Sequence, residues 1–261
     1  MGVLNVTPDS FSDGGRFLDP ESAYARMREI ARQGAAICDV GAESTRPGAV
    51  PVPLEEELRR LAPVFSLVRE RGLPLPLSVD TSKAPVAAVA LEAGAVLVND
   101  VTAGRGDPAL LPLVAERGAA LCLMHMRGDP RTMQDDPRYG DVVAEVRDFL
   151  AARLEEALAA GVREERVLLD PGIGFGKTLE HNLALLAGLP ALAALGRPLV
   201  VGVSRKGMIG ALTGRATGDR LAGSLAAALA AVARGAAVVR AHDVRETVDA
   251  LAVWSAVQGG T

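Results

Sequence analysis

Short apolar runs alternate with longer amphipathic segments along the chain, and this alternation repeats eight times. Runs of about four to eight residues with few interrupting charges are typical of strands that are buried on both faces of a parallel sheet. We therefore predict eight strands, over residues 1–6, 35–40, 75–79, 95–99, 119–124, 166–169, 198–203 and 236–240.

The segments between these strands carry signals of helix ends. Aspartate precedes proline at positions 19–20, 107–108 and 136–137, a pair that suits an N-cap and the first helical turn. The sequence DVRE at 243–246 has the spacing of a capping box. Glycines follow the helical segments, where left-handed C-caps are common: Gly34, Gly72, Gly94, Gly118, Gly161 and Gly235.

Eight strand–helix units within 261 residues, with no linker-like stretch, predict a closed (β/α)8 barrel, the TIM barrel fold. The same reasoning predicts one domain over residues 1–261. The structural alternative is an open doubly wound sheet, which is built from the same units.

Charge and composition narrow the class of protein. The net charge of −4 argues against binding to nucleic acid or to an anionic membrane, either of which would need a basic surface. The sequence shows no signal peptide before its first motif and no uninterrupted apolar run of about 18 residues, so we expect a cytoplasmic enzyme. Cys38 and Cys122 lie in apolar surroundings without metal-ligand spacing, which predicts buried, reduced side chains.

Polar residues end all eight apolar runs. In a parallel barrel the carboxyl ends of the strands open at one mouth, where active sites are assembled. Any one of these residues, such as Asp80, Asp100 or Asp170, could be a structural cap, but eight such endings favour a shared site. They are Asn5, Asp39 with Glu43, Asp80, Asn99 with Asp100, His125, Asp170, Ser204 with Lys206, and Arg240 with His242.

Two residue types are used selectively. The chain has 28 lysines and arginines, but only Lys83, Lys177 and Lys206 are lysines, and all three follow strand ends. Lysine offers a compact point charge that guanidinium does not mimic, although chance and capping are alternatives for Lys83 and Lys177. Phe11 and Phe175 lie in loops of a chain with 3% aromatic residues, which suggests covers for a flat ligand, or else packing over the barrel top.

Several familiar chemistries find no support. The run GIGFGKT at 172–178 resembles a phosphate-binding P-loop, but Pro171 stands where the Walker pattern needs glycine. There is no HExxH, CxxC or GxSxG motif, so the sequence does not indicate a zinc site or a serine nucleophile.

The loop motifs together resemble those of the dihydropteroate synthase family, in the same order and over essentially the whole chain. They are GVLNVTPDSFSDGG at 2–15, GAESTRPG at 41–48, SVDTSK at 78–83, ND at 99–100, LMHM at 123–126, DPGIGFGK at 170–177, GVSRK at 202–206 and RAHD at 240–243. The resemblance implies condensation of 6-hydroxymethyl-7,8-dihydropterin diphosphate with 4-aminobenzoate, giving dihydropteroate and pyrophosphate in folate biosynthesis. It also implies a Mg2+ cofactor, inhibition by sulfonamides and a homodimer.

The resemblance assigns roles residue by residue. It implies a pterin pocket formed by Asp80, Asn99, Asp170, Lys206, Met124, Phe175 and Gly202. It implies a diphosphate site formed by Thr45, Arg240 and His242, with Asn5 as the metal ligand. It implies an aminobenzoate site, closed by loops, that contains Phe11, Arg46, Pro47, Phe175, Lys206 and Gly207.

The sequence departs from the family pattern in two places. The family usually has residues before its first strand, commonly a hairpin beneath the barrel, whereas here Met1 opens the strand. Gly207 and Ala241 stand where bulkier or hydroxyl-bearing residues are common, which removes side-chain contacts there.

Two other functions remain open at this point. A methyltransferase that acts on methyltetrahydrofolate with a corrinoid partner shares the barrel and the pterin pocket, but it needs no diphosphate site. A catalytically silent pterin-binding barrel would be expected to lack loop residues such as Asn5, Arg46 and Lys206, all of which are present.

Overall fold

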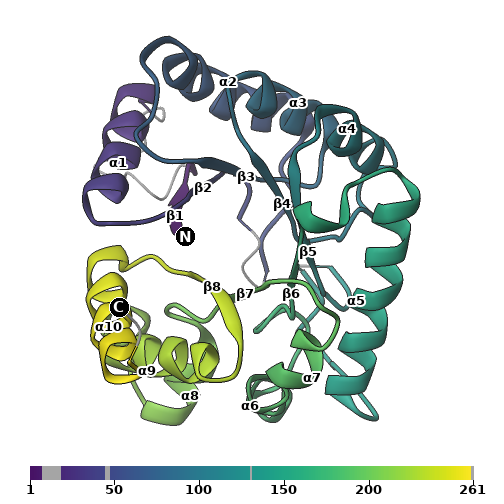
Figure 1. Cartoon of the computed structure of the whole chain (residues 1–261), viewed down its shortest axis with the longest axis vertical. Coiled ribbons are helices and arrows are strands. Elements are labelled where there is room, and N and C mark those ends of the chain that lie inside the picture. Colours follow the sequence, from purple (N-terminus) through teal and green to yellow (C-terminus); the bar gives the residue numbers. More distant parts are fainter. Residues whose placement is uncertain (8–18, 45–47, 130, 260–261) are drawn as a thin grey trace.

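The computed structural model describes residues 1–7, 19–44, 48–129 and 131–259, and it places eight parallel strands in one sheet with the order β1 to β8 (Figure 1). The sheet closes on itself through a bridge between Gly2 and Ala241, where the Val3 amide donates to the Ala241 carbonyl at 3.1 Å. The predicted (β/α)8 barrel is therefore confirmed. The strands are β1 (Gly2–Asn5), β2 (Cys38–Gly41), β3 (Leu77–Asp80), β4 (Leu97–Asp100), β5 (Ala120–Met124), β6 (Val167–Asp170), β7 (Leu199–Gly202) and β8 (Ala236–Arg240).

Helices surround the barrel and connect successive strands (Figure 1). The α-helices are α1 (Pro20–Arg32), α2 (Leu54–Arg71), α3 (Ala84–Glu92), α4 (Leu110–Arg117), α5 (Val142–Ala159), α6 (Leu179–Ala187), α7 (Leu189–Ala193), α8 (Gly207–Thr213), α9 (Leu221–Val232) and α10 (Val244–Val257). Within the described residues, no helix is long and apolar enough to cross a bilayer.

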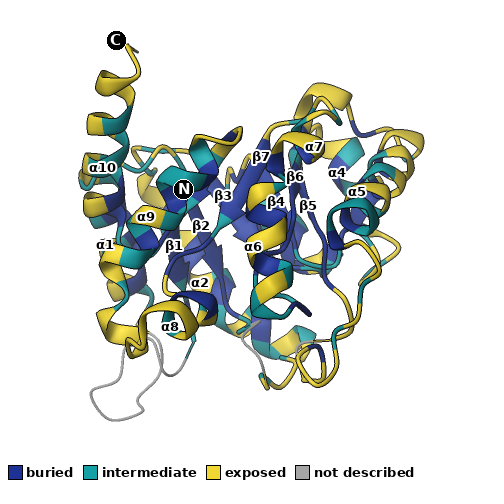
Figure 2. Ribbon diagram, turned by 90° about the horizontal axis from the view of Figure 1, so that it is seen from below, coloured by how far each residue is buried: buried dark blue, intermediate teal, exposed yellow. Residues whose placement is uncertain are grey.

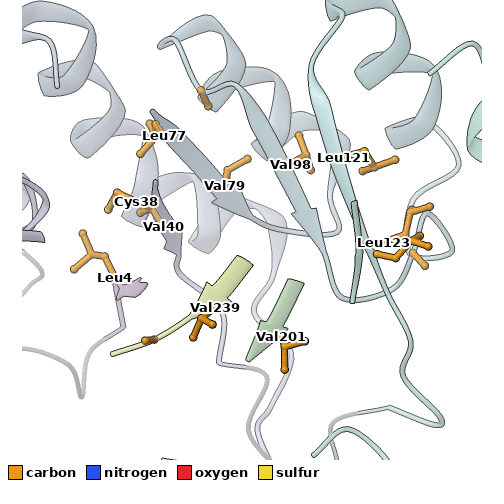
Figure 3. Packing of buried hydrophobic residues seen from close by; sticks show 14 of the residues in the cluster. Leu4, Cys38, Val40, Leu77, Val79, Val98, Leu121, Leu123, Val201 and Val239 are labelled. Carbon is orange, nitrogen blue, oxygen red and sulfur yellow. The ribbon is translucent and has the colours of Figure 1, made fainter. Parts of the chain in front are cut away.

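The hydrophobic core lies mainly between the strands and the surrounding helices. Burial in Figure 2 is concentrated on the strands and on the inner faces of the helices, whose outer faces are exposed. Figure 3 shows side chains of this layer on β1 to β5, β7 and β8, among them Leu4, Val40, Val79 and Val239. Burying such side chains contributes about 1.5–3 kcal/mol each, which fixes the strands and hence the positions of their carboxyl ends.

Both cysteines are buried and unpaired, as predicted. Cys38 belongs to the outer layer. Cys122 packs inside the barrel against Leu97 and Val200. Burial raises the pKa of the Cys38 thiol to about 12, so this cysteine stays protonated and unreactive.

The helix ends confirm some sequence predictions and correct others. Asp19 caps α1 by accepting from two backbone amides, and all six predicted glycines have positive φ. The cap expected at 136–137 was wrong, because α5 begins at Val142 and is capped by Asp141. The capping box expected at 243–246 was also wrong. Asp243 precedes α10 but forms no side-chain cap, because its carboxylate binds Arg205 instead.

Candidate active site

Strand register brings the predicted polar residues to one edge of the barrel. Asn5 is level with Gly41, Gly41 with Asp80, and Asp80 with Asn99. On the other side, Met124 is level with Asp170, and Gly202 is level with Arg240. The carboxyl ends of all eight strands therefore surround a single mouth, as expected for this fold.

Arg240 is the central charged group of this mouth. Its Nε donates to Asp39 Oδ2 at 2.7 Å, and its Nη2 donates to Asp80 Oδ2, also at 2.7 Å. Burial lowers the pKa of the guanidinium, but the charges of Asp39 and Asp80 outweigh burial, so the pKa is raised. For Asp80, burial raises the pKa to about 7 even though Arg240 opposes the shift. One guanidinium thus serves two buried carboxylates.

Asn99 joins the same network from β4. Its Nδ2 donates to Asp39 Oδ2 at 3.1 Å, which fixes the amide and turns its oxygen away from that bond. Asp39 is fully buried, and its second oxygen, Oδ1, has no hydrogen-bond partner among the described residues. An unpartnered buried carboxylate oxygen is costly. Asp39 Oδ1 is therefore available to accept a hydrogen bond from a ligand.

Asp170 and Lys206 form the opposite side of the mouth. Burial raises the pKa of the Asp170 carboxyl, although Lys206 lowers it, and Asp170 Oδ1 accepts from the Gly172 amide at 2.7 Å. Lys206 donates to the Ile173 carbonyl. Burial lowers the pKa of Lys206 to about 8, although the charge of Asp170 opposes this shift. Within the described residues, Lys206 has no ion pair at salt-bridge distance.

Phe175 and three methionines provide an apolar wall beside Lys206. Met124, Met126 and Met133 form a buried cluster against which Phe175 packs. The Lys206 ammonium lies 4.5 Å from the centre of the Phe175 ring, a cation–π geometry. A partly exposed aromatic ring next to a cation and apolar side chains is suited to contact a flat heterocycle.

His242 follows β8 and faces the end of β7. Its backbone amide donates to Ser204 Oγ at 3.2 Å, and its ring Nδ1 lies 3.1 Å from the same oxygen. This contact orients the imidazole beside the strand that carries Arg240. Gly202 ends β7 opposite Arg240, and a Cβ at this position would lie 3.8 Å from the Arg240 Cβ.

A second lysine is buried beneath the loop after β6. Lys177 Nζ lies 2.9 Å from His125 Nδ1 and 2.9 Å from the Phe175 carbonyl. Burial, and then the charge of Lys206, lower the pKa of Lys177 to about 7. Burial, followed by the charge of Lys177, lowers the pKa of His125 to about 3, so His125 is a neutral acceptor.

Close packing shapes this loop. Gly172 has φ +67°, and a Cβ there would lie 1.8 Å from the His125 carbonyl oxygen. Gly176 has φ +64°, with its Cβ position 2.4 Å from the Arg127 carbonyl oxygen. Only glycine fits these two positions. The glycines that resemble a P-loop therefore hold Phe175 against the segment that follows β5.

Four of the predicted site residues lie outside the described residues: Phe11, Thr45, Arg46 and Pro47. Gly207 is exposed and begins α8 directly after Lys206. Asn5 ends β1 and is partly exposed.

Sequence reasoning singled out Lys83 by its position after a strand, but the structure gives it a structural role. Its ammonium binds Glu43 at 2.5 Å and the fully buried Glu57 at 2.6 Å. These ion pairs join the segment after β2 to α2 and to the segment after β3.

The family resemblance implies no role for Asp39, Ser204 or Lys177, although all three contribute buried contacts at the site. A signal for Asp39 exists in the sequence, because a carboxylate inside an apolar run must find a buried partner. The sequence does not indicate that the partner is Arg240, 201 residues away.

A barrel whose mouth combines hydrogen-bonding carboxylates, an aromatic wall and buried cations defines an enzyme-like site for a flat, polar ring that carries an anionic group. The family described as "Pterin binding enzyme" matches residues 1–242. The dihydropteroate synthase of Neisseria meningitidis serogroup B is 49% identical over 98% of this chain and 92% of its own length. The chain belongs to the dihydropteroate synthase family of pterin-binding enzymes.

Solved structures agree with this assignment. The dihydropteroate synthase of Xanthomonas albilineans with 4-aminobenzoic acid is similar with a TM-score of 0.91 and 52% identity, covering 100% of this chain and 93% of that one. The Yersinia pestis dihydropteroate synthase in a sulfonamide drug complex has a TM-score of 0.93 and 44% identity, covering 99% of this chain and 94% of that one.

Proposed function

We propose that this protein transfers the dihydropterin-methyl group of 6-hydroxymethyl-7,8-dihydropterin diphosphate to the amino group of 4-aminobenzoate, with release of pyrophosphate. The observation that carries the proposal is the convergence of Asp80, Asn99, Asp170, Lys206 and Arg240 on one barrel mouth, beside His242. The similarity to synthases that bind 4-aminobenzoic acid and a sulfonamide supports the choice of the second substrate.

The pterin ring presents adjacent donors and acceptors along one edge. Carboxylates on β3 and β6 can accept its N–H groups, and the Asn99 amide can both donate and accept. The raised pKa values of Asp80 and Asp170 show how strongly burial disfavours their charge. Ring N–H donors stabilise the ionised forms, so pterin binding offsets part of this cost.

Arg240 and His242 are placed to hold the diphosphate. Arg240 is already held by Asp39 and Asp80, so its guanidinium is oriented before any ligand arrives. A cation fixed in advance stabilises negative charge on the leaving oxygen without reorganisation during the reaction. We assign Thr45 to the same subsite, and Phe11, Arg46, Pro47 and Gly207, with Lys206 and Phe175, to the aminobenzoate side.

The residues fit Mg2+ as the cofactor. Asn5 ends β1, the strand next to β8 in the closed barrel, and would contribute one neutral amide oxygen. Mg2+ takes oxygen ligands, keeps several waters and commonly binds substrate phosphates, so a single protein oxygen is enough. When bound to the diphosphate, the ion would supply further neutralisation of the leaving group's charge.

The bond change follows from this arrangement. The bond between the pterin methylene carbon and the diphosphate oxygen breaks, the electron pair leaves with pyrophosphate, and the carbon becomes electron-deficient and is stabilised by the ring. The uncharged arylamine nitrogen attacks this carbon and then loses a proton. An arylamine is uncharged near neutral pH, so its attack needs no strong base from the protein.

The decisive experiment mixes purified protein with the pterin diphosphate, 4-aminobenzoate and Mg2+ and measures pyrophosphate release. We expect release that depends on 4-aminobenzoate and yields dihydropteroate. Release without 4-aminobenzoate, or no release, would contradict the proposal. Transfer of a methyl group from methyltetrahydrofolate to a corrinoid would support the methyltransferase instead.

A further inference from the structure

The loop after β7 contains a residue in an unusual backbone conformation. Arg205 has φ +59°, and Ala103 is the only other non-glycine residue with positive φ among those the structure describes. Side chains disfavour this left-handed region, so surrounding contacts must hold it. The Arg205 amide donates to Ser224 Oγ at 2.9 Å, and Arg220 Nη1 donates to the Arg205 carbonyl at 3.1 Å.

The side chain of Arg205 connects this loop to the loop after β8. Its Nε donates to Asp243 Oδ2 at 3.0 Å, and its Nη2 binds Asp243 Oδ1, so the contact is bidentate. An aspartate immediately before a helix usually accepts hydrogen bonds from the first helical turn. Asp243 forms no such cap for α10 and is committed to Arg205 instead. The helix cap that the sequence favours is thus replaced by a contact between the loop after β7 and the loop after β8.

A second contact joins the same two loops. Ser204, directly before Arg205, accepts from the His242 amide at 3.2 Å and lies 3.1 Å from His242 Nδ1. Ser204 and Arg205 lie within two residues of Lys206 on one loop, and on the other loop the partners are His242 itself and its neighbour Asp243. The two loops are therefore fastened to each other beside the groups that we assign to the pterin and to the diphosphate.

We infer that Arg205, through its bidentate pair with Asp243, is a positioning residue that fixes the separation between Lys206 and His242. This inference rests on the proposed function. A ligand that contacts both loops benefits from a fixed separation, because the entropy of ordering them is already lost. A ligand that contacts only the pterin end does not.

The experiment compares two ligands that share the pterin ring, of which only one carries the diphosphate group. Calorimetric titration in Mg2+ measures the affinity for 6-hydroxymethyl-7,8-dihydropterin and for its diphosphate. For Arg205→Gly we expect about tenfold weaker binding of the diphosphate, a coupling typical of residues in contact, and unchanged binding of the pterin alcohol. Glycine suits the positive φ, so this variant should be thermally at least as stable as Arg205→Ala while binding the diphosphate equally poorly.

Substitutions at Asp243 test whether Arg205 acts through its ion pair with this residue. Asp243→Asn should show the same selective loss, and the double variant Arg205→Gly with Asp243→Asn should lose no more than either single variant. The exchanged pair Arg205→Asp with Asp243→Arg should recover most of the diphosphate affinity, because aspartate tolerates a left-handed backbone. Arg215→Ala removes the exposed ion pair with Asp219 and serves as the matched control with unchanged affinities.

Additive losses in the double variant, or equal losses for both ligands, would overturn the inference. So would a diphosphate affinity of Arg205→Gly equal to that of the Arg215→Ala control. The wild-type protein separates this result from the proposed function: if it neither binds the diphosphate nor releases pyrophosphate, the proposed function fails. If it does both and the variants lack the selective loss, only the positioning role fails.

Discussion

Buried charged groups have different kinds of partner on the two sides of the barrel mouth. On the arginine side, formed by Asp39, Asp80 and Arg240, opposite charges meet directly at 2.7 Å. On the lysine side, formed by Lys177 and Lys206, the ammonium groups contact carbonyl oxygens and an imidazole. Neither of these lysines has an ion pair at salt-bridge distance among the residues described.

The pKa values follow this difference. The charges of two carboxylates raise the pKa of Arg240, against the effect of burial. Burial lowers the pKa of Lys177 to about 7 and that of Lys206 to about 8. The charge of Arg240 is thus compensated within the protein, whereas the lysine side holds cations whose charge is only partly compensated. We conclude that the first side is organised before binding and that the second gains most from an electron-rich ligand.

The largest effect is expected from removing the shared cation. Arg240→Met leaves Asp39 and Asp80 as buried carboxylates without their shared cation, and it should lower the free energy of unfolding by about 3–5 kcal/mol near neutral pH. Urea unfolding measures this loss. The control Arg215→Met, at an exposed ion pair, should change stability by about 0.5 kcal/mol or less. If the Arg240→Met protein is as stable as the control, Arg240 does not stabilise the buried charges of Asp39 and Asp80.

A smaller effect with a definite pH dependence is expected at Lys177. Its pKa is about 7 in the folded protein, against an ordinary value of 10.5, so between these values the unfolded chain binds more protons than the folded one. Stability from this group therefore rises with pH across that window, and below it the full cost of burying the charge applies. The groups that face it are His125, Lys206, Asp170 and Arg127.

Lys177→Met removes this titration. The stability of the wild type relative to the variant should increase by about 2 kcal/mol from about pH 7 to about pH 9. Urea unfolding at both pH values gives the difference. If the gap between the two proteins is the same at both, Lys177 does not carry a lowered pKa.

The smallest effect on stability is expected at Lys206, where function should respond instead. Lys206→Met retains the stem of the side chain and removes a poorly compensated charge, so the unfolding free energy should change by less than about 1 kcal/mol. Affinity for the pterin should fall about tenfold or more, because a charged hydrogen bond to the ligand is lost. Calorimetry with the pterin alcohol tests this. Unchanged affinity would remove Lys206 from the pocket.

The barrel could be predicted from the sequence because the apolar runs are short, regularly spaced and end in polar residues. The same pattern placed Asp80, Asn99, Asp170, Lys206 and Arg240 at one edge, since parallel strands share their carboxyl ends. These inferences need only local pattern and topology.

The sequence alone does not predict which charged side chains pair with each other. The pairing of Arg240 with Asp39 spans 201 residues and depends on closure of the barrel between β8 and β1. Asp243 has the sequence of a helix cap, yet Arg205 binds its carboxylate across two loops. Both cases involve competing partners for one charged group, and only the three-dimensional arrangement decides between them.

The presence of only three lysines in the chain allows the contrast between the two sides to be measured directly. Nuclear magnetic resonance with nitrogen-15-labelled lysine follows the ionisation of each ammonium group as pH changes, with single-lysine variants to assign the signals. We expect Lys83, between two glutamates, to titrate above its ordinary value, Lys177 near pH 7 and Lys206 near pH 8. Pterin binding should shift the titration of Lys206 most. Three lysines that all remain charged up to about pH 10, with no response of Lys206 to the pterin, would contradict this account.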